Sequence, residues 1–214
     1  MRLRSTLAAG LGVLALATPA SAAVPAPDCH GIAFTDPAGD QVLVSSAVPL
    51  RPTQAIDIRR VYLTGSGSTQ KVNIEVSQLS AWNNTEYTFS WLDNVNFPYS
   101  WELEGTFLGT NGTSDKSTQA VLYHRDINGS AVAFSGHATV TAFHGAVVNG
   151  VEGPGVIQFG LPQNWGPLGF PSTITGMKAG AVQYESNAVT QIALRQDTAA
   201  YSNPSNGNNW TQPC

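Results

Sequence analysis

Charged side chains are scarce in this sequence, and no cluster of basic ones occurs. Asp, Glu, Lys and Arg make up 11% of the 214 residues, and the 10 basic residues include Arg2 and Arg4. Without these two arginines, 8 basic residues stand against 14 acidic ones, which leaves a net charge near −6. Because nucleic-acid binding depends on clustered Lys and Arg side chains that neutralise phosphates, the sequence predicts no nucleic-acid partner.

Long apolar runs are missing beyond the N-terminal segment. Residues 7–17 form an apolar run that follows two arginines and precedes Ala20-Ser21-Ala22, a small-x-small cleavage motif. This arrangement predicts a secretory signal peptide over residues 1–22 and therefore a secreted, extracellular protein. The run is shorter than the roughly 20 residues that cross a bilayer, so we expect no membrane span.

Cysteine is limited to Cys29 and Cys214. Export to an oxidising compartment favours a disulfide between them, which would tie the two ends of the mature chain together. The chain-entropy model credits so long a loop with on the order of 5 kcal/mol of stability. The alternative is a pair of free or intermolecular thiols.

Helical periodicity is nowhere sustained beyond a turn or two. Instead, short runs alternate between apolar and polar residues and are separated by Gly, Asn, Ser and Pro, which indicates β-strands and turns. In KVNIEVSQL (71–79), Val72, Ile74 and Val76 share one face, and Asn73 lies on the polar face. This pattern is typical of a half-buried antiparallel strand.

The other strand candidates follow the same pattern. They are IDIRRVYL (56–63), EYTFSWL (86–92), YSWELEGTF (99–107), QAVLYHRD (119–126), SAVAFSG (130–136), HATVTAFHG (137–145), GVIQFGLP (155–162), TITGMKAGAVQYE (173–185) and TQIALRQD (190–197). About nine or ten strands, with turn signals every roughly 8 to 12 residues, predict an all-β antiparallel β-sandwich of jelly-roll or immunoglobulin-like layout. We expect a Pro-rich lead-in over residues 23–31 and a single domain over residues 32–214.

The segment FTDPAGD, residues 34–40, sets two carboxylates around a proline and a glycine. Pro37 and Gly39 suit a tight turn in which Asp36 accepts backbone hydrogen bonds, so a metal-free turn accounts for every residue except Asp40. The second interpretation uses both carboxylates as ligands of Ca²⁺, which prefers about six to eight oxygen atoms. The residues alone leave both interpretations open.

Several segments together resemble a broad set of secreted bacterial β-sandwich modules. FTDPAGD is followed by AIDIRRVYLTG (55–65) and KVNIEVSQLS (71–80), an order similar to the DP-x-GD … DI signature of DOMON-like and family-nine carbohydrate-binding-module-like domains. Residues 155–183 resemble the strand, proline turn and strand near the end of these domains, and RQDTAAY (195–201) resembles their closing D-x-A segment.

The resemblance implies a sandwich stabilised by calcium. In such domains the N-terminal acidic loop meets aspartates of the DI strand and of the C-terminal segment. The ligands implied for this sequence are Asp36, Asp40, Asp57 and Asp197. The partner implied is a carbohydrate or a cell-surface protein.

Aromatic residues fall into two groups. Those at strand period between Tyr87 and Trp101 are expected to fill the core. Trp82, Trp165 and Trp210 stand among turn residues. We therefore expect each to be partly exposed and take them as candidate ligand-binding rings for a sugar, the alternative being that they cap the end of the core.

Linear catalytic motifs are missing, since the sequence contains neither G-x-S-x-G nor H-E-x-x-H. This absence favours a non-catalytic binding or structural domain. The alternative is an extracellular hydrolase whose site converges from separate loops. Its candidate residues are Asp40, Glu102, Glu104, His137 and His144.

Overall fold

The computed structural model describes residues 23–40, 42–43, 56–79, 84–93, 99–109, 115–126, 130–162, 170–186, 191–202 and 209–214. Most of these residues are in β-strands. The one helix in these ranges is a single 3₁₀ turn, η1 (Gly67–Thr69). None of the described residues form a helix with the length and apolarity that a membrane crossing requires.

Fifteen strands are present in the described ranges. They are β1 (Ile32–Thr35), β2 (Val42–Leu43), β3 (Ile58–Thr64), β4 (Lys71–Val76), β5 (Asn84–Leu92), β6 (Ser100–Gly109), β7 (Asp115–Arg125), β8 (Ala131–Phe143), β9 (Val147–Val148), β10 (Val151–Glu152), β11 (Gly155–Gly160), β12 (Thr173–Thr175), β13 (Lys178–Ser186), β14 (Gln191–Ala200) and β15 (Asn209–Thr211). Ten of them have four residues or more, which agrees with the predicted number.

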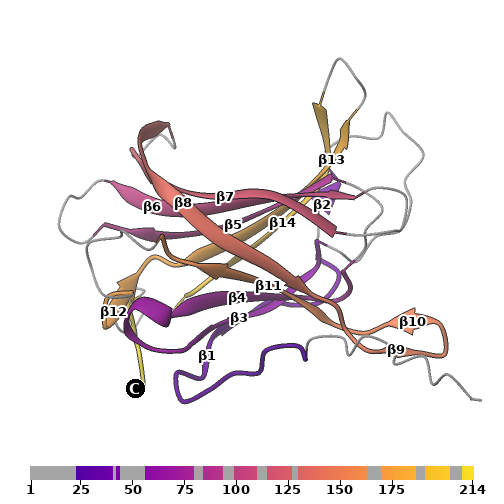
Figure 1. The fold of residues 1–214 in the computed structure, drawn as a ribbon, viewed down its shortest axis with the longest axis horizontal. Helices are drawn as coiled ribbons and strands as arrows, with labels where there is room; N and C mark the ends of the chain where they lie inside the picture. The colour runs from indigo at the N-terminus through magenta and orange to yellow at the C-terminus, as the bar shows by residue number, and fades with distance from the viewer. Residues whose placement is uncertain are drawn as a thin grey trace, which may run out of the picture.

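Eleven strands form one sheet in the order β1-β3-β4-β11-β8-β7-β6-β5-β13-β14-β2. All neighbouring pairs are antiparallel. The sheet curls until β3 and β14, which are not neighbours in this order, lie close together (Figure 1). The prediction of an all-β antiparallel fold is confirmed, and one nearly closed sheet supplies both of the facing layers that the predicted sandwich requires.

Strand β8 joins two runs, 130–136 and 137–145, that the sequence predicts as separate strands. Near its middle, Gly136 has a φ of 153°, and the register between β8 and β7 shifts between Leu122 and Tyr123. Such an irregularity adds a residue to one strand and bends it while pairing continues. The glycine therefore marks a bend within one strand and not a turn between two.

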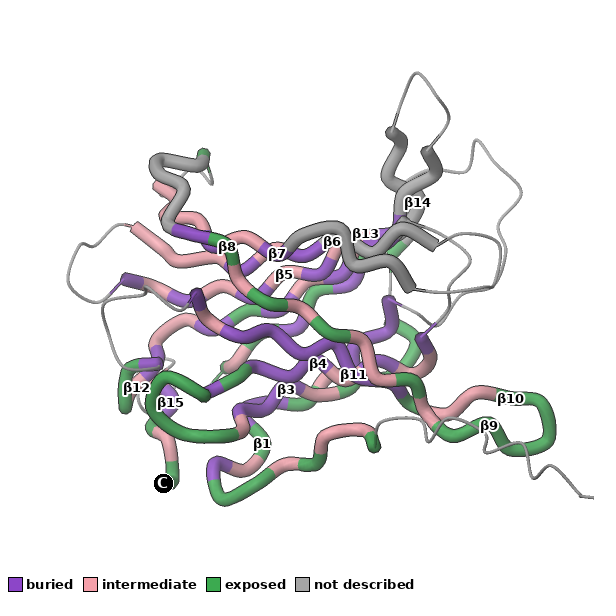
Figure 2. The backbone as a smooth tube through the Cα atoms, viewed as in Figure 1, coloured by how far each residue is buried: buried purple, intermediate pink, exposed green. Residues whose placement is uncertain are grey.

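The inner face of the curled sheet forms the core (Figure 2). Val72, Ile74 and Val76 are fully buried there, as the alternation in β4 predicts. Tyr87, Phe89 and Trp91 of β5 are also buried, which confirms their assignment to the core. Tyr99 and Trp101 are only half-buried, and Trp101 packs against the core.

The outer face of β4 differs from the prediction. Asn73, expected on a solvated face, is fully buried and accepts a hydrogen bond from Gln158 Nε2 at 2.8 Å. The lead-in, residues 23–31, contacts the neighbouring strand β3. The hydroxyl group of Tyr62 in β3 donates a hydrogen bond to the carbonyl of Pro25 at 2.5 Å. The amide of Asn73 is thus buried with a partner, whereas Lys71 and Glu75 on the same face keep contact with solvent.

A small hairpin, β9 and β10, projects from the body of the molecule (Figures 1 and 2). Asn149 and Gly150 form its two-residue turn with φ values of 53° and 78°, as a type I′ connection requires. Val147, Val148 and Val151 are all exposed on this hairpin.

Candidate functional site

Three chain segments bring together the aspartates that the resemblance implies as calcium ligands. Asp36 and Asp40 flank the turn that follows β1, Asp57 immediately precedes β3, and Asp197 lies in β14. The N–H of Asp36 donates to the carbonyl of Arg59 at 3.0 Å, which holds the turn against β3. Because the curled sheet places β14 beside β3, Asp197 reaches the same location.

We call these four aspartates the acidic cluster. One carboxylate oxygen from each of Asp36, Asp40 and Asp197 lies within 4.8 Å of the other two. Asp197 is buried, Asp36 is half-buried and Asp40 is exposed. The cluster therefore opens to solvent on the side of Asp40.

Asp57 is not among the three convergent carboxylates, and it holds the turn in place. It is 4% exposed. Its Oδ1 accepts the N–H of Gly39 at 2.7 Å, and its Oδ2 accepts the hydroxyl hydrogen of Ser77. Gly39 has a φ of 77°, which glycine adopts without strain. FTDPAGD is therefore a true tight turn that also carries two carboxylates toward a third.

Asp197 connects β14 to the beginning of β3. Its Oδ2 accepts the N–H of Ile58 at 2.7 Å, and its Oδ1 accepts the N–H of Thr198 at 2.8 Å. Burial raises the pKa of Asp197, and the charges of Asp40 and Asp57 act in the same direction, while the two backbone hydrogen bonds oppose the change.

Asp36 is the least compensated member of the acidic cluster. Burial, followed by the negative charges of Asp197, Asp40 and Asp57, raises its pKa to about 6. Its Oδ2 is buried and has no hydrogen-bond partner among the described residues. No Lys, Arg or His within the described ranges forms an ion pair with the cluster. The negative charge is therefore concentrated and lacks a side-chain counter-ion there.

The donor chemistry of the acidic cluster fits a hard divalent cation. Carboxylates, backbone carbonyls and water are the ligands of Ca²⁺, whereas zinc and copper sites use imidazole or thiolate groups. The three convergent side chains supply carboxylate oxygens only, and Asp36 Oδ2 has a lone pair with no donor directed at it. A cation bound between these carboxylates would offset the burial and the repulsion that together raise the pKa of Asp36.

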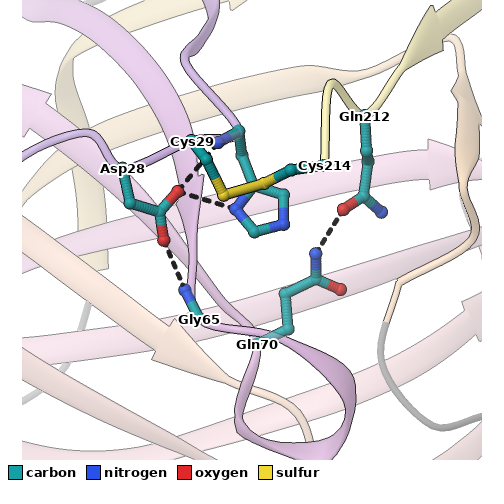
Figure 3. The surroundings of a disulfide bond; sticks show 7 residues. Asp28, Cys29, Gly65, Gln70, Gln212 and Cys214 are labelled. Carbon is teal, nitrogen blue, oxygen red and sulfur yellow. Dashed lines mark hydrogen bonds and ion pairs between the residues drawn. A yellow bond between two sulfur atoms is a disulfide. The ribbon is translucent and has the colours of Figure 1, made fainter.

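The predicted disulfide between Cys29 and Cys214 is confirmed, with a Cα–Cα distance of 5.9 Å (Figure 3). Free cysteines are absent, so the alternative of two free thiols does not hold. The bridge fastens the lead-in to the last residue of the chain.

The expectation that Trp210 is partly exposed is wrong. Its side chain is 7% exposed and belongs to the core, because β15 pairs with β12 and sets Trp210 opposite Ile174. Trp210 thus caps the core, which was the alternative for these rings. Trp82 and Trp165 lie outside the described residues.

The hydrolase candidates are spread over several elements of the fold. Arg125 binds both glutamates of β6, with Nε 2.5 Å from Glu102 Oε1 and Nη2 3.0 Å from Glu104 Oε2. Burial raises the pKa of Glu102, although Arg125 opposes the change. Of the remaining candidates, His137 is exposed on β8 and lies across Val121 of β7 from Glu104. Asp40 belongs to the acidic cluster, and His144 is bonded to Glu152 beside the hairpin.

A histidine and aspartate pair that sequence reasoning did not single out lies where β5 ends. His124 Nε2 is 3.0 Å from Asp93 Oδ2, and the histidine ring stacks on Trp101 at a centroid distance of 4.4 Å. An imidazole oriented by a carboxylate is one component of a hydrolase site. Among the described residues, no hydroxyl or thiol is bonded to His124. Asp93 follows one predicted strand (86–92) and His124 lies in another (119–126), and no linear signal indicates that they meet.

No family model, curated protein or solved structure matches this chain. The resemblance to DOMON-like and family-nine carbohydrate-binding-module-like domains therefore rests on its short motifs.

Proposed function

We propose that this chain is a secreted, non-catalytic binding domain in which Ca²⁺ at the acidic cluster holds the N-terminal turn against the closing strands of the sheet. Two observations support this proposal: one carboxylate oxygen from each of Asp36, Asp40 and Asp197 lies within 4.8 Å of the other two, and a buried oxygen of Asp36, Oδ2, lacks a hydrogen-bond partner among the described residues. Asp57 keeps the turn in the conformation that presents Asp36 and Asp40.

A cation at the acidic cluster should stabilise the folded state by electrostatic attraction to the carboxylates. Three carboxylates held close together repel one another, and burial of two of them strengthens the repulsion because water screens it less. A divalent cation replaces this repulsion with attraction. Since the unfolded chain does not assemble the cluster, binding stabilises the folded state by about 2.7 kcal/mol at a calcium concentration 100 times the Kd.

Thermal unfolding with EDTA and with added calcium tests the proposal, and calorimetry gives the stoichiometry. We expect one Ca²⁺ per chain and a higher Tm with calcium. Asp36→Asn should raise the Tm in EDTA, because it removes a buried charge, and should lower it relative to the unmodified chain in calcium.

Asp126→Asn is the matched control, because Asp126 lies outside the cluster and uses Oδ1 to accept the N–H of Ser130. We expect this variant to keep the full response to calcium. If calcium neither changed the Tm of the unmodified chain nor released or absorbed heat, calcium binding would be contradicted. FTDPAGD would then be a metal-free turn.

As the partner we propose a surface carbohydrate or a cell-surface protein. The support is the resemblance, together with Trp82 and Trp165, which stand in the polar segments SAWNNT and PQNWGP. Sugar rings pack their C–H faces on exposed aromatic rings. Retention on insoluble polysaccharides and on a glycan array should fall when both tryptophans are replaced by alanine. Undiminished retention by a folded double variant would contradict the assignment of these rings.

Export can be tested separately. We expect a bacterial host that carries the full sequence to release a protein that begins at Ala23, as determined by intact mass. Retention of residues 1–22 on protein that stays inside the cell would contradict secretion.

A further inference from the structure

Four metal-ligating groups meet where the two ends of the chain are joined. Asp28, Cys29, His30 and Cys214 each place one ligand atom within 4.8 Å of the other three. Two sulfur atoms, an imidazole and a carboxylate are donors that zinc accepts in tetrahedral sites. In this structure the sulfur atoms are bonded to each other, so their electron pairs are committed to the disulfide.

We propose that reduction of the Cys29–Cys214 disulfide converts this junction into a four-ligand site for Zn²⁺, formed by Cys29, Cys214, His30 and Asp28. A thiol reductant supplies the two electrons and two protons. The S–S bond breaks, two cysteine thiols form, and two reductant thiols leave as one disulfide. Zn²⁺ then displaces the two thiol protons and binds the thiolates.

Contacts other than the disulfide hold the Cys29 side of the junction. The carbonyl of Asp28 accepts the N–H of Gly31 at 3.0 Å, which closes a tight turn around Cys29. The Oδ2 of Asp28 accepts the N–H of Gly65 at 2.8 Å, which anchors this turn to the end of β3 (Figure 3). Cys29 therefore keeps its place when the S–S bond is broken.

The Cys214 side is held in the same way. The N–H of Gln212 donates to the carbonyl of Ser172 at 2.9 Å, and its Nε2 donates to the carbonyl of Pro171 at 2.6 Å. The buried side chain of Gln70 donates a further hydrogen bond to Gln212 Oε1 (Figure 3). The last residues of the chain thus stay beside the lead-in without a covalent bond, and the two thiols remain neighbours.

His30 and Asp28 are already oriented as a pair of donors. His30 is 4% exposed, and its Nδ1 lies 2.6 Å from Asp28 Oδ1. The same oxygen accepts the backbone N–H of His30 at 2.9 Å, which limits rotation of the carboxylate. To bind Zn²⁺ at about 2.0 Å from each, Nδ1 and Oδ1 must move apart to roughly 3.3 Å, and the neutral ring then carries its proton on Nε2.

Measurement of zinc bound by the oxidised and the reduced protein tests the proposal. Calcium is present in both samples, so that the acidic cluster is exposed to the same competing cation in each. After anaerobic reduction, we expect one Zn²⁺ per chain above the oxidised protein, and a thiolate-to-metal charge-transfer band when Co²⁺ is used as the probe. His30→Ala and Asp28→Asn should each weaken zinc binding by about tenfold or more. Cys29→Ser with Cys214→Ser should abolish it.

His144→Ala is the matched control, because His144 is an exposed histidine that is also paired with a carboxylate, that of Glu152. It should bind zinc like the unmodified reduced chain. Equal zinc uptake by the oxidised and reduced proteins, or full affinity in both His30→Ala and Asp28→Asn, would overturn the proposal. If reduction unfolds the chain, zinc must restore its β-sheet circular dichroism, and failure to do so also counts against the site. The zinc test does not depend on the calcium proposal. The oxidised and the reduced protein both contain the acidic cluster, so any metal bound there contributes equally to both.

Discussion

The Oδ2 of Asp197 in β14 accepts the backbone N–H of Ile58 in β3 at 2.7 Å, across 139 positions of the sequence. β3 and β14 are not neighbours in the sheet, so no ladder bond is available to this N–H from β14. A buried backbone N–H needs a partner, and a side chain supplies it here. The acidic cluster therefore lies where the curled sheet comes closest to closing.

Removal of the Asp197 carboxylate should destabilise the contact between β3 and β14 even without metal. In EDTA, Asp197→Ala should lower the free energy of unfolding by about 1 to 3 kcal/mol, because the N–H of Ile58 then stays buried without a partner. Asp197→Asn keeps an acceptor oxygen and removes a charge that burial disfavours, so this variant should be clearly more stable than Asp197→Ala. Urea unfolding of the three proteins measures the difference, and equal losses in the two variants would contradict the role of the hydrogen bond.

The raised pKa of Asp36 predicts how metal-free stability depends on pH. This pKa is about 6 in the folded chain against an ordinary value of 3.8, so the folded state holds the proton more tightly than the unfolded state. The contribution is therefore fully present below pH 3.8 and is lost as the pH rises through about 6. It amounts to no more than about 3 kcal/mol.

Other carboxylates titrate in the same range, so the informative quantity is the difference between the unmodified chain and Asp36→Asn. Urea unfolding in EDTA at a series of pH values gives this difference. We expect the stability advantage of Asp36→Asn over the unmodified chain to grow as the pH rises to neutrality. Parallel profiles for the two proteins would show that Asp36 does not titrate as stated.

The acidic loop shows what the sequence can and cannot predict. Proline, glycine and two aspartates in FTDPAGD indicate a turn, and the resemblance adds Asp57 and Asp197. The structure brings Asp36, Asp40 and Asp197 together but gives Asp57 other partners. That difference depends on where Ser77 and the N–H of Gly39 lie in space, and neither position follows from residue spacing.

Period-two patterns predict which residues share a face of a strand, but not what covers each face. Val72 and Ile74 are buried as expected, yet Asn73 is buried as well, because it bonds to Gln158 of the neighbouring strand on the outer face. Trp210 is buried for a related reason. Its strand pairs with β12, and a partner that distant in the sequence cannot be identified from local turn residues.

The stability of a Trp210 variant tests whether this ring belongs to the core. Trp210→Ala should lower the free energy of unfolding by about 3 to 5 kcal/mol, because a large buried ring leaves a cavity. Val148→Ala is the control, since Val148 is 66% exposed, and we expect a change within about 0.5 kcal/mol. Urea unfolding compares them, and a small effect of Trp210→Ala would restore this ring as a candidate surface for sugar binding.

Alanine variants of Asn73 in β4 and Gln158 in β11 test whether the two side chains contribute to stability together, through the hydrogen bond between them. Each single alanine variant leaves a buried amide group of the other residue without one partner and should cost about 1 to 3 kcal/mol of stability. The double variant removes both groups, so it should cost less than the sum by about 1 kcal/mol. Urea unfolding of the four proteins gives this coupling energy. Costs that add within about 0.5 kcal/mol would mean that the 2.8 Å hydrogen bond contributes nothing beyond packing.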